Sequence, residues 1–270
     1  MPVIEINNSE DPRLDEYRDI RDRDLRGPNA GEGLFVGEQR LVVERMLRRP
    51  GVTRSVLISA NWRDPIATLA PADVPVYVTD TATMKIVAGF DIHRGVLAMG
   101  YRRAVERPRL AGTLLDRETV TLLLCEDVTN IDNIGLLFRN AAAFGVDAVL
   151  LSPLCHDPLY RKSLRVSIGH ALDVPFARSR DWLADLGRLR DAGILLIAAA
   201  TGEGSVDLDS IPPARRVGLV VGQEFEGVSA PTLAACDRIA RIPMAPGVDS
   251  LNVGVAAAVC LHRFSTARRV

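Results

Sequence analysis

Polar side chains that could take part in chemistry gather in three short segments of the C-terminal half of the chain. The segments are Asn133–Arg139, Gly222–Glu226 and Ser250–Asn252. Each is preceded by an apolar run typical of a buried strand. In parallel sheets, ligands bind beyond the carboxyl ends of the strands. We therefore expect these segments to meet at one edge of a sheet and to form a binding site.

The first segment predicts a helix with one functional face. Asn130 and Asn133 are residue types that favour helix N-cap positions. Gly135 and Arg139 are four residues apart and so share a helix face, where the glycine leaves space for the arginine to project toward the strand ends. The alternative is an ordinary amphipathic helix with one solvated arginine. Spacing alone does not decide between the two.

The second and third segments combine turn residues with polar side chains. Gly222 ends a strong β run, where a glycine permits close approach of a ligand to the backbone, and Glu224 follows it. Ser250 is a candidate N-cap for a helix that starts near Leu251, and Asn252 is a polar residue in its otherwise apolar first turn. The alternatives are a plain strand-to-helix turn and an asparagine that only supports the cap.

Composition and motif content exclude several classes of protein. With 33 basic and 34 acidic residues, any surface for nucleic acid must be a local patch. The four cysteines form no CxxC pair, so we expect no metal site and no disulfide framework. Neither a G-x-G-x-x-G fingerprint nor a P-loop is present, which disfavours a conventional nucleotide cofactor. The polar, acidic N-terminus and the short apolar runs predict a cytoplasmic protein without a membrane segment.

The order of apolar runs predicts an α/β protein with two domains. Residues 119–270 alternate strand-like and helix-like segments, the arrangement of a parallel sheet with helices on both faces. Strands are expected at Val120–Cys125, Ala148–Leu151, Ile194–Ala200, Val217–Val221 and Ile239–Ile242, and helices at Asn133–Phe144, Arg161–Gly169, Arg180–Asp191 and Leu251–Phe264.

The N-terminal part predicts a smaller α/β domain over residues 1–101. Alternating charges at Asp11–Arg26 suggest a solvated helix, and Val36–Leu47 has a helical pattern. Residues 102–118 contain a proline, a glycine and five arginines, and indicate an interdomain linker. The alternatives for the linker arginines are contact with a nucleic-acid backbone and plain solvation; those considered are Arg102, Arg103, Arg107 and Arg109.

The three segments together resemble the motifs of SpoU-type (TrmH-like) RNA 2′-O-ribose methyltransferases of the SPOUT superfamily. The matching stretches are N-I-G-L-L-F-R-N-A at 133–141, V-G-Q-E-F-E-G at 221–227 and I-P-M-A-P-G-V-D-S-L-N-V at 242–253. Leu164–His170 also resembles a family segment, and the resemblance covers residues 119–270. Residues 1–100 look like the ribosomal-protein-like substrate-binding domain of many members, at Phe35–Leu41 and His93–Leu97.

The resemblance implies a fold, a cofactor and partners. The C-terminal domain would contain a deep trefoil knot, a rare exception to ordinary chain connections. S-adenosylmethionine would bind in the knot, held by backbone groups of Gly222, Ile242 and Leu251. The protein would be a homodimer with its site near the subunit interface. The separate N-terminal module favours ribosomal RNA as substrate over transfer RNA.

The resemblance also assigns roles to the polar residues. In the family, the arginine that corresponds to Arg139 is assigned to activating the ribose hydroxyl. Because a guanidinium is essentially always protonated, we expect phosphate binding and charge stabilisation, and base action stays open. Glu224 would orient Arg139 or the loop of the third motif. Asn133, Ser250 and Asn252 would position the ribose and the adjacent phosphate.

Three residues depart from the family pattern. Gln223 and Phe225 stand where the second motif usually has asparagine and a small residue, and Gly254 stands where serine is more common. These departures motivate an alternative function, a catalytically weak RNA-binding factor that retains the fold.

Overall fold

The computed structural model describes residues 3–27, 33–90, 92, 95–107, 109–110 and 112–265. It forms two compact units: unit 1 consists of Met1–Glu106 and Leu159–Leu172, and unit 2 of Arg107–Pro158 and Asp173–Val270. Leu159–Leu172, which the sequence pattern places in the C-terminal domain, therefore packs with the N-terminal part. His93, which contributes to the N-terminal resemblance, and Pro108 of the expected linker lie outside the described residues.

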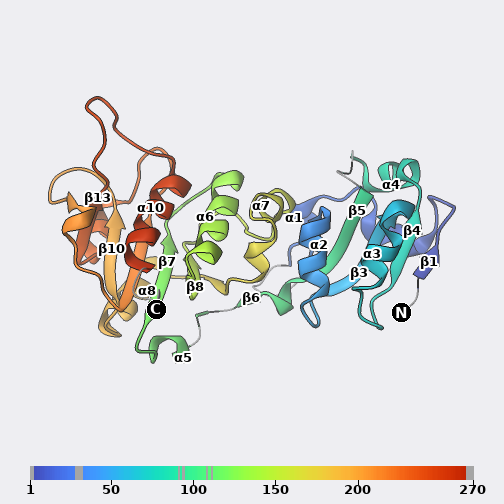
Figure 1. Ribbon diagram of the computed structural model, residues 1–270, viewed down its shortest axis with the longest axis horizontal. Helices are drawn as coiled ribbons and strands as arrows, with labels where there is room; N and C mark the ends of the chain where they lie inside the picture. The colour runs from blue at the N-terminus through green and yellow to red at the C-terminus, as the bar shows by residue number, and fades with distance from the viewer. Residues whose placement is uncertain are drawn as a thin grey trace. The chain divides into compact units, whose positions relative to one another are not determined.

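The core of unit 2 is a parallel sheet, as predicted (Figure 1). The strand order is β11-β13-β10-β12-β7-β8-β9-β6, and the neighbouring pairs from β11 to β9 are parallel. Its strands are β6 (Glu106–Arg107), β7 (Val120–Cys125), β8 (Ala148–Leu151), β9 (Phe176–Arg178), β10 (Leu195–Ala199), β11 (Val206–Asp207), β12 (Arg216–Val221) and β13 (Arg238–Arg241). The five predicted strands are confirmed, whereas β6, β9 and β11 are too short to give a sequence signal.

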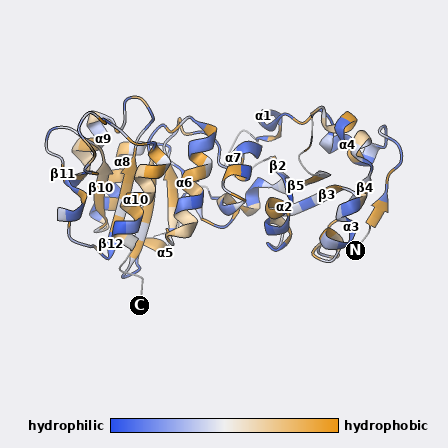
Figure 2. Cartoon of the chain, turned by 45° about the horizontal axis from the view of Figure 1, so that its top comes forward, coloured by the Kyte–Doolittle hydropathy of each residue, from blue (hydrophilic) through white to orange (hydrophobic). Residues whose placement is uncertain are grey.

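Helices cover both faces of this sheet. On one face, α6 (Ile131–Ala143) packs against α10 (Val253–Ser265), which also crosses β12 and β10. On the other face, α8 (Trp182–Asp191) packs against β10 and against α9 (Ala230–Ala235). The short helix α5 (Gly112–Leu115) precedes β7. Apolar residues concentrate in the strands and on the helix sides that face them (Figure 2).

Burial on both faces explains why the strands are continuous apolar runs. Every residue of β7 is buried. Leu122 and Leu124 pack in one cluster with Leu186 and Leu189 of α8, so the residues between them point to the opposite face. Each fully buried leucine contributes roughly 1.5–3 kcal/mol through apolar burial. The sheet is therefore a rigid base for the loops at its carboxyl edge.

Unit 1 contains a five-stranded mixed sheet with the order β1-β4-β3-β5-β2. β1, β4 and β3 are parallel, and β5 pairs antiparallel with β3 and β2. The strands are β1 (Val3–Glu5), β2 (Leu34–Glu38), β3 (Thr53–Ser59), β4 (Val76–Thr79) and β5 (Val96–Tyr101). The helices are α1 (Asp22–Leu25), α2 (Arg40–Leu47), α3 (Arg63–Ala67), α4 (Thr81–Ala88) and α7 (Arg161–Val166).

Two helix predictions in unit 1 are wrong in their boundaries. Asp11–Arg26 is a 3-10 helix at Pro12–Tyr17 followed by α1, and the fully buried Tyr17 bonds through its hydroxyl to Ser55 Oγ at 2.6 Å. The segment expected to be a solvated helix therefore buries part of its residues, including Leu14 and Tyr17, in the core of unit 1. Val36–Leu47 is a strand followed by a helix, because Gln39 adopts a φ of 81°, which breaks the helical path between β2 and α2.

Ion pairs attach α7 to the rest of unit 1. Arg165 Nη1 lies 3.3 Å and Arg161 Nε 3.6 Å from Oε2 of the buried Glu38. The Arg161 guanidinium also stacks 3.7 Å from the ring centroid of Phe90. A buried carboxylate is stable only when it is paired. These contacts explain why the segment around α7 packs with unit 1.

Neither alternative considered for Arg102, contact with a nucleic-acid backbone or plain solvation, agrees with its position in the structure. Its side chain is buried, forms an ion pair with Glu106 at 3.1 Å and donates to the Leu34 carbonyl at 3.2 Å. Arg103 lies over the ring of Tyr101 at 4.6 Å from its centroid. Among the four arginines considered, only Arg107 and Arg109 have exposed positions without a described partner.

Within the described residues, no helix has the length and apolar character needed to cross a membrane.

The four cysteines are free thiols; three are buried and Cys236 is partly buried. Burial raises the pKa of Cys236 and of Cys260 to about 12, and raises the pKa of Cys125 and Cys155 above the ordinary value. The thiolate is the nucleophile, so at pH 8 only about one in ten thousand groups with a pKa near 12 is reactive.

We predict that none of the four reacts rapidly with a thiol reagent at pH 8. Unfolding in urea should expose all four, and rapid labelling of the folded protein would contradict the prediction.

Candidate active site

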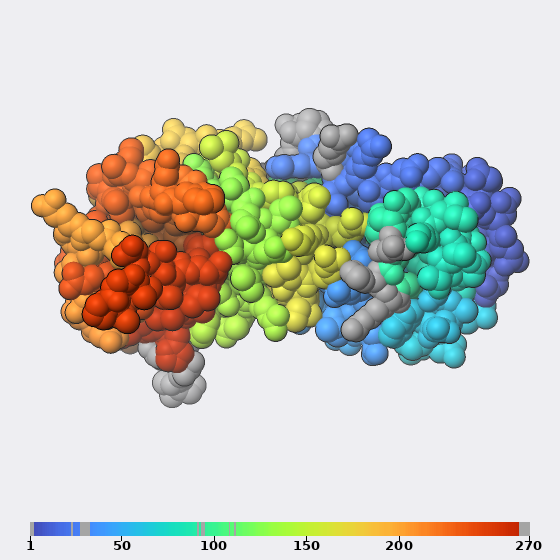
Figure 3. All heavy atoms as spheres, turned by 90° about the horizontal axis from the view of Figure 1, so that it is seen from above, coloured from blue at the N-terminus to red at the C-terminus, as the bar shows by residue number. Residues whose placement is uncertain are grey.

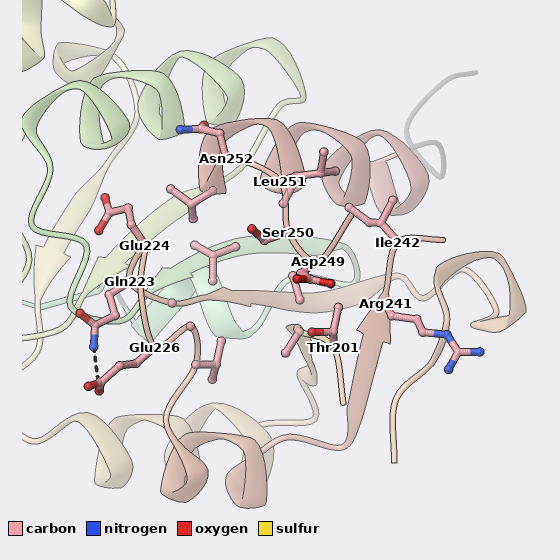
Figure 4. A pocket seen from close by; sticks show the side chains of 18 of the residues that line it. Thr201, Gln223, Glu224, Glu226, Arg241, Ile242, Asp249, Ser250, Leu251 and Asn252 are labelled. Atoms are coloured by element: carbon pink, nitrogen blue, oxygen red, sulfur yellow. Dashed lines mark hydrogen bonds between the residues drawn. The ribbon is translucent and has the colours of Figure 1, made fainter. Parts of the chain in front are cut away.

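Two of the three polar segments, Gly222–Glu226 and Ser250–Asn252, line a cavity of about 690 Å³ at the carboxyl edge of the unit 2 sheet (Figure 4). It lies beyond the last residues of β10, β12 and β13. A cavity of this size at the strand ends is typical of a small-molecule site. The predicted residues in its lining are Gly222, Glu224, Ile242, Ser250, Leu251 and Asn252. The structure therefore places six of the eight predicted site residues around one cavity, and Asn133 and Arg139 do not line it.

The Asn133 side chain joins the three segments by hydrogen bonds. Its Nδ2 donates to Glu224 Oε1 at 2.6 Å, and its Oδ1 accepts from Asn252 Nδ2 at 2.8 Å. Asn133 is only 5% exposed, so both of its polar groups need partners. Glu224 is expected to orient Arg139 or the loop of the third motif; its described bond goes to Asn133, which bonds in turn to Asn252 of that motif. We call Glu224, Asn133 and Asn252 the bridging triplet.

Asn252, and not Ser250, caps the last helix. Helix α10 begins at Val253, and Asn252 Oδ1 accepts from the backbone N–H of Gly254 at 2.9 Å and of Val255 at 3.4 Å. The prediction of a helix start near Leu251 with a Ser250 cap is wrong by two residues. Because the amide has both a donor and an acceptor, Asn252 caps the helix and bonds to Asn133 at once.

A second bond fixes the start of α10 against α6. Asn140 Nδ2 donates to the Gly254 carbonyl at 2.6 Å. A Cβ at Gly254 would lie 3.0 Å from Leu136 Cβ and 3.1 Å from Asn252 Oδ1. These distances are shorter than ordinary contacts, so the glycine lets the two helices approach. The departure from serine at this position is therefore explained by packing.

Gly222 is required by the turn that follows β12. A Cβ at this position would lie 2.1 Å from the backbone of Gly227 and 2.4 Å from Val228 N. Only glycine permits that approach. Gly227 N donates to the Gln223 carbonyl at 3.1 Å, which closes the turn. The sequence predicts that a ligand comes close to the backbone at Gly222, and this stays a prediction. In the structure, the backbone of Gly227 and Val228 occupies the space beside Gly222.

Glu126 anchors the end of this turn and gave no sequence signal. The carboxylate is buried and accepts from Ser229 N at 2.8 Å, Ser229 Oγ at 2.7 Å and Thr232 Oγ1 at 2.5 Å. Ser229 also caps α9 by accepting from the backbone N–H of Thr232, which agrees with the alternative of a plain strand-to-helix turn. Ser229 lies 103 residues from Glu126 along the chain, so the two residues are brought into contact only by the tertiary structure.

Arg139 and Ser250 remain available to a ligand. Arg139 is exposed on α6 and does not line the cavity. Within the described part of the chain, its guanidinium makes no hydrogen bond or ion pair, and the Ser250 hydroxyl makes none either. Asn130, one of the expected caps, accepts from the N–H groups of Asp132 and Asn133 and so begins α6.

The charges that line the cavity are mainly acidic. Glu224, Glu226 and Asp249 are in its wall. The one basic residue among the described lining residues is Arg241, whose side chain points away and bonds to Asp207 at 2.7 Å (Figure 4). No group of three or more metal-ligating side chains occurs in the described residues. This cavity therefore suits a cationic ligand without phosphate groups.

The bridging triplet predicts a measurable coupling energy. We expect Asn133→Ala and Glu224→Ala each to lower the free energy of unfolding, and the double variant to lose less than the sum. The coupling should be about 1 kcal/mol, because the two side chains share one hydrogen bond. Urea unfolding of the four proteins measures it. Glu226→Ala combined with Asn133→Ala is the matched control, and the two losses of unfolding free energy should add. If the losses in the Glu224 cycle also add, the two side chains are not coupled and the prediction is wrong.

Comparisons with known proteins agree with the geometry. Residues 121–262 match the sequence profile of the SpoU rRNA Methylase family. An uncharacterized tRNA/rRNA methyltransferase of Mycobacterium bovis is 39% identical over 97% of this chain and 91% of its own. The 23S rRNA (guanosine-2′-O-)-methyltransferase of Vibrio cholerae is 33% identical over 63% of this chain and 68% of its own.

Solved structures share the fold. An AdoMet-bound rRNA methyltransferase of Sinorhizobium meliloti superposes with a TM-score of 0.77 at 24% identity, over 99% of this chain and 98% of that one. A SpoU methyltransferase of Streptomyces viridochromogenes has a TM-score of 0.76 at 21% identity, over 96% and 99%. The profile covers more than half of the 270 residues. The chain belongs to the SpoU rRNA Methylase family of RNA methyltransferases.

Proposed function

We propose that the protein transfers a methyl group from S-adenosylmethionine to a ribose 2′-oxygen in ribosomal RNA, in the cytoplasm. The observation that carries this proposal is the bridging triplet, in which the buried Asn133 of the first motif bonds to Glu224 and Asn252, the residues of the other two motifs that line the cavity. The 23S rRNA 2′-O-methyltransferase among its relatives supports the substrate class. Transfer RNA is the alternative substrate.

The cavity fits S-adenosylmethionine as the methyl donor. Gly222, Ile242 and Leu251, the residues expected to hold it, are in the lining. The acidic side chains of the wall complement a ligand that carries a sulfonium and an ammonium and no phosphate. This cofactor supplies an activated methyl group when bound. The AdoMet complex of the Sinorhizobium meliloti structure supports the same assignment.

The residues of the chain would position and stabilise the ribose. A 2′-hydroxyl is a weak nucleophile until its proton leaves or its developing charge is stabilised. Ser250 and Asn252 lie at the cavity and can hold the sugar, whereas the acidic lining disfavours the phosphate that the resemblance also assigned to them. Arg139 is exposed and permanently charged, so it can bind phosphate and stabilise the alkoxide. Asn133 is buried, so we assign it and Glu224 to positioning.

We also propose the knot, the RNA-binding role and the homodimer that the family resemblance implies. Gly222–Val228 and Ile242–Val253 line the same cavity, as two crossing segments of a knot would. Unit 1 would bind the RNA. Leu251, just before α10, and Val255 and Val259 on it recur every four residues and are exposed, and this helix lies open on the face shown in Figure 3. An exposed apolar helix face supports burial against a second subunit.

The methylation assay tests the proposed reaction. The protein is incubated with labelled S-adenosylmethionine and total RNA from a strain that lacks the gene, and the methylated nucleosides are identified. We expect 2′-O-methyl label in ribosomal RNA. Label confined to transfer RNA would select the alternative substrate, and RNA binding without any methylation would select the weak RNA-binding factor.

Arg139→Ala is expected to lower kcat/KM by about 100- to 1000-fold, the usual cost of losing one charge-stabilising donor. Binding of S-adenosylhomocysteine should not change, because Arg139 does not line the cavity. Arg188→Ala is the control, since Arg188 is an exposed arginine on α8, on the opposite face of the sheet. Equal activity of the two variants would remove Arg139 from the mechanism.

Val255→Asp is expected to dissociate the dimer. A charge in the centre of an apolar interface has no partner and costs several kcal/mol. Molar mass by light scattering measures the change. Leu183→Asp on α8 is the matched control, because Leu183 is 47% exposed and Val255 is 49% exposed. A monomeric wild-type protein, or a dimer unaffected by Val255→Asp, would rule out this interface.

A further inference from the structure

Phe225 is the most exposed large apolar side chain in the described residues, at 96%. It lies at the tip of the turn between Gly222 and Gly227, and it is part of the cavity lining. Its side chain contributes almost no burial to the fold, so packing does not explain its presence. An aromatic side chain at the mouth of a ligand cavity is instead available to a partner.

The turn holds Phe225 in a defined place. Gln223 and Gly227 form a bridge pair, and Gln223 Nε2 donates to Glu226 Oε2 at 3.2 Å (Figure 4). On the other side of Phe225, Glu224 is held by Asn133 at 2.6 Å. The aromatic ring is therefore carried between two tethered residues. A ring on a fixed turn loses little conformational freedom when it binds a ligand.

Charge decides which part of an RNA can lie on this turn. Glu224 and Glu226 flank Phe225, so their carboxylates repel phosphate groups. A nucleobase carries no charge and presents a flat face that stacks on aromatic side chains. Phe225 shares the cavity mouth with Ser250 and Asn252, where the proposed function places the target ribose.

We propose that Phe225 is a stacking platform for an unpaired nucleobase at or beside the methylated nucleotide. It would contribute to the choice of substrate, because only RNA with a base free to leave its helix can use the platform. The inference rests on the proposed function. It adds a specificity-determining residue that lies outside the bridging triplet and the cofactor contacts.

The test compares four substitutions in the full chain: Phe225→Ala, Phe225→Leu, Phe225→Tyr and Phe225→Trp. Ribosomal RNA from a strain that lacks the gene is the probe. We expect Phe225→Ala and Phe225→Leu to raise KM and the filter-binding Kd for this RNA by about 5- to 100-fold, the usual effect of losing one stacked base. Tyr and Trp should restore binding. The melting temperature, kcat and the Kd of S-adenosylhomocysteine should change little.

Leu154→Ala is the control, because Leu154 is another strongly exposed apolar residue of unit 2. Equal RNA affinity of Phe225→Ala and wild type overturns the inference, as does full binding by Phe225→Leu, which lacks a π face. Weaker cofactor binding with unchanged RNA affinity would make Phe225 a cofactor contact, and loss of the dimer would make it an interface residue. If wild type binds this RNA without methylating it, the proposed reaction fails, and the filter-binding series still tests stacking.

Discussion

The candidate site depends on the two hydrogen bonds of one buried amide. Asn133 donates to Glu224 and accepts from Asn252, residues that are 91 and 119 positions away in the chain. A buried amide without partners destabilises the fold by about 1–3 kcal/mol, so the three segments are stable only when they meet. The position of the cavity wall follows from this requirement.

The side chains around the site divide into those that hold the backbone and those that face solvent. Glu126 fixes the turn after β12 through Ser229 and Thr232, and Asn140 fixes the start of α10. Arg139 is exposed and makes no described bond. Fixing the backbone in advance lowers the cost of ordering the site when a substrate binds. The exposed side chains can then contact RNA from defined positions.

Charge is also divided between the cavity and its surroundings. The wall carries carboxylates, and its one described basic residue is paired outside the cavity. Arg139 lies on α6, away from that lining. Such a separation would keep the RNA phosphates away from the carboxylates that face a cationic methyl donor. Phe225, between two carboxylates, is where a neutral base fits better than a phosphate.

The sequence by itself determined the parallel sheet of unit 2, because strands buried on both faces must be continuous apolar runs. It also determined the order of the three segments and the cap at Asn130, since both are local properties. Only the tertiary structure decided that Asn252 and Glu224 both bond to Asn133, and that Glu126 anchors the turn. These partners are set by distances between strands and helices that are far apart in the chain, and local residue patterns do not encode such distances.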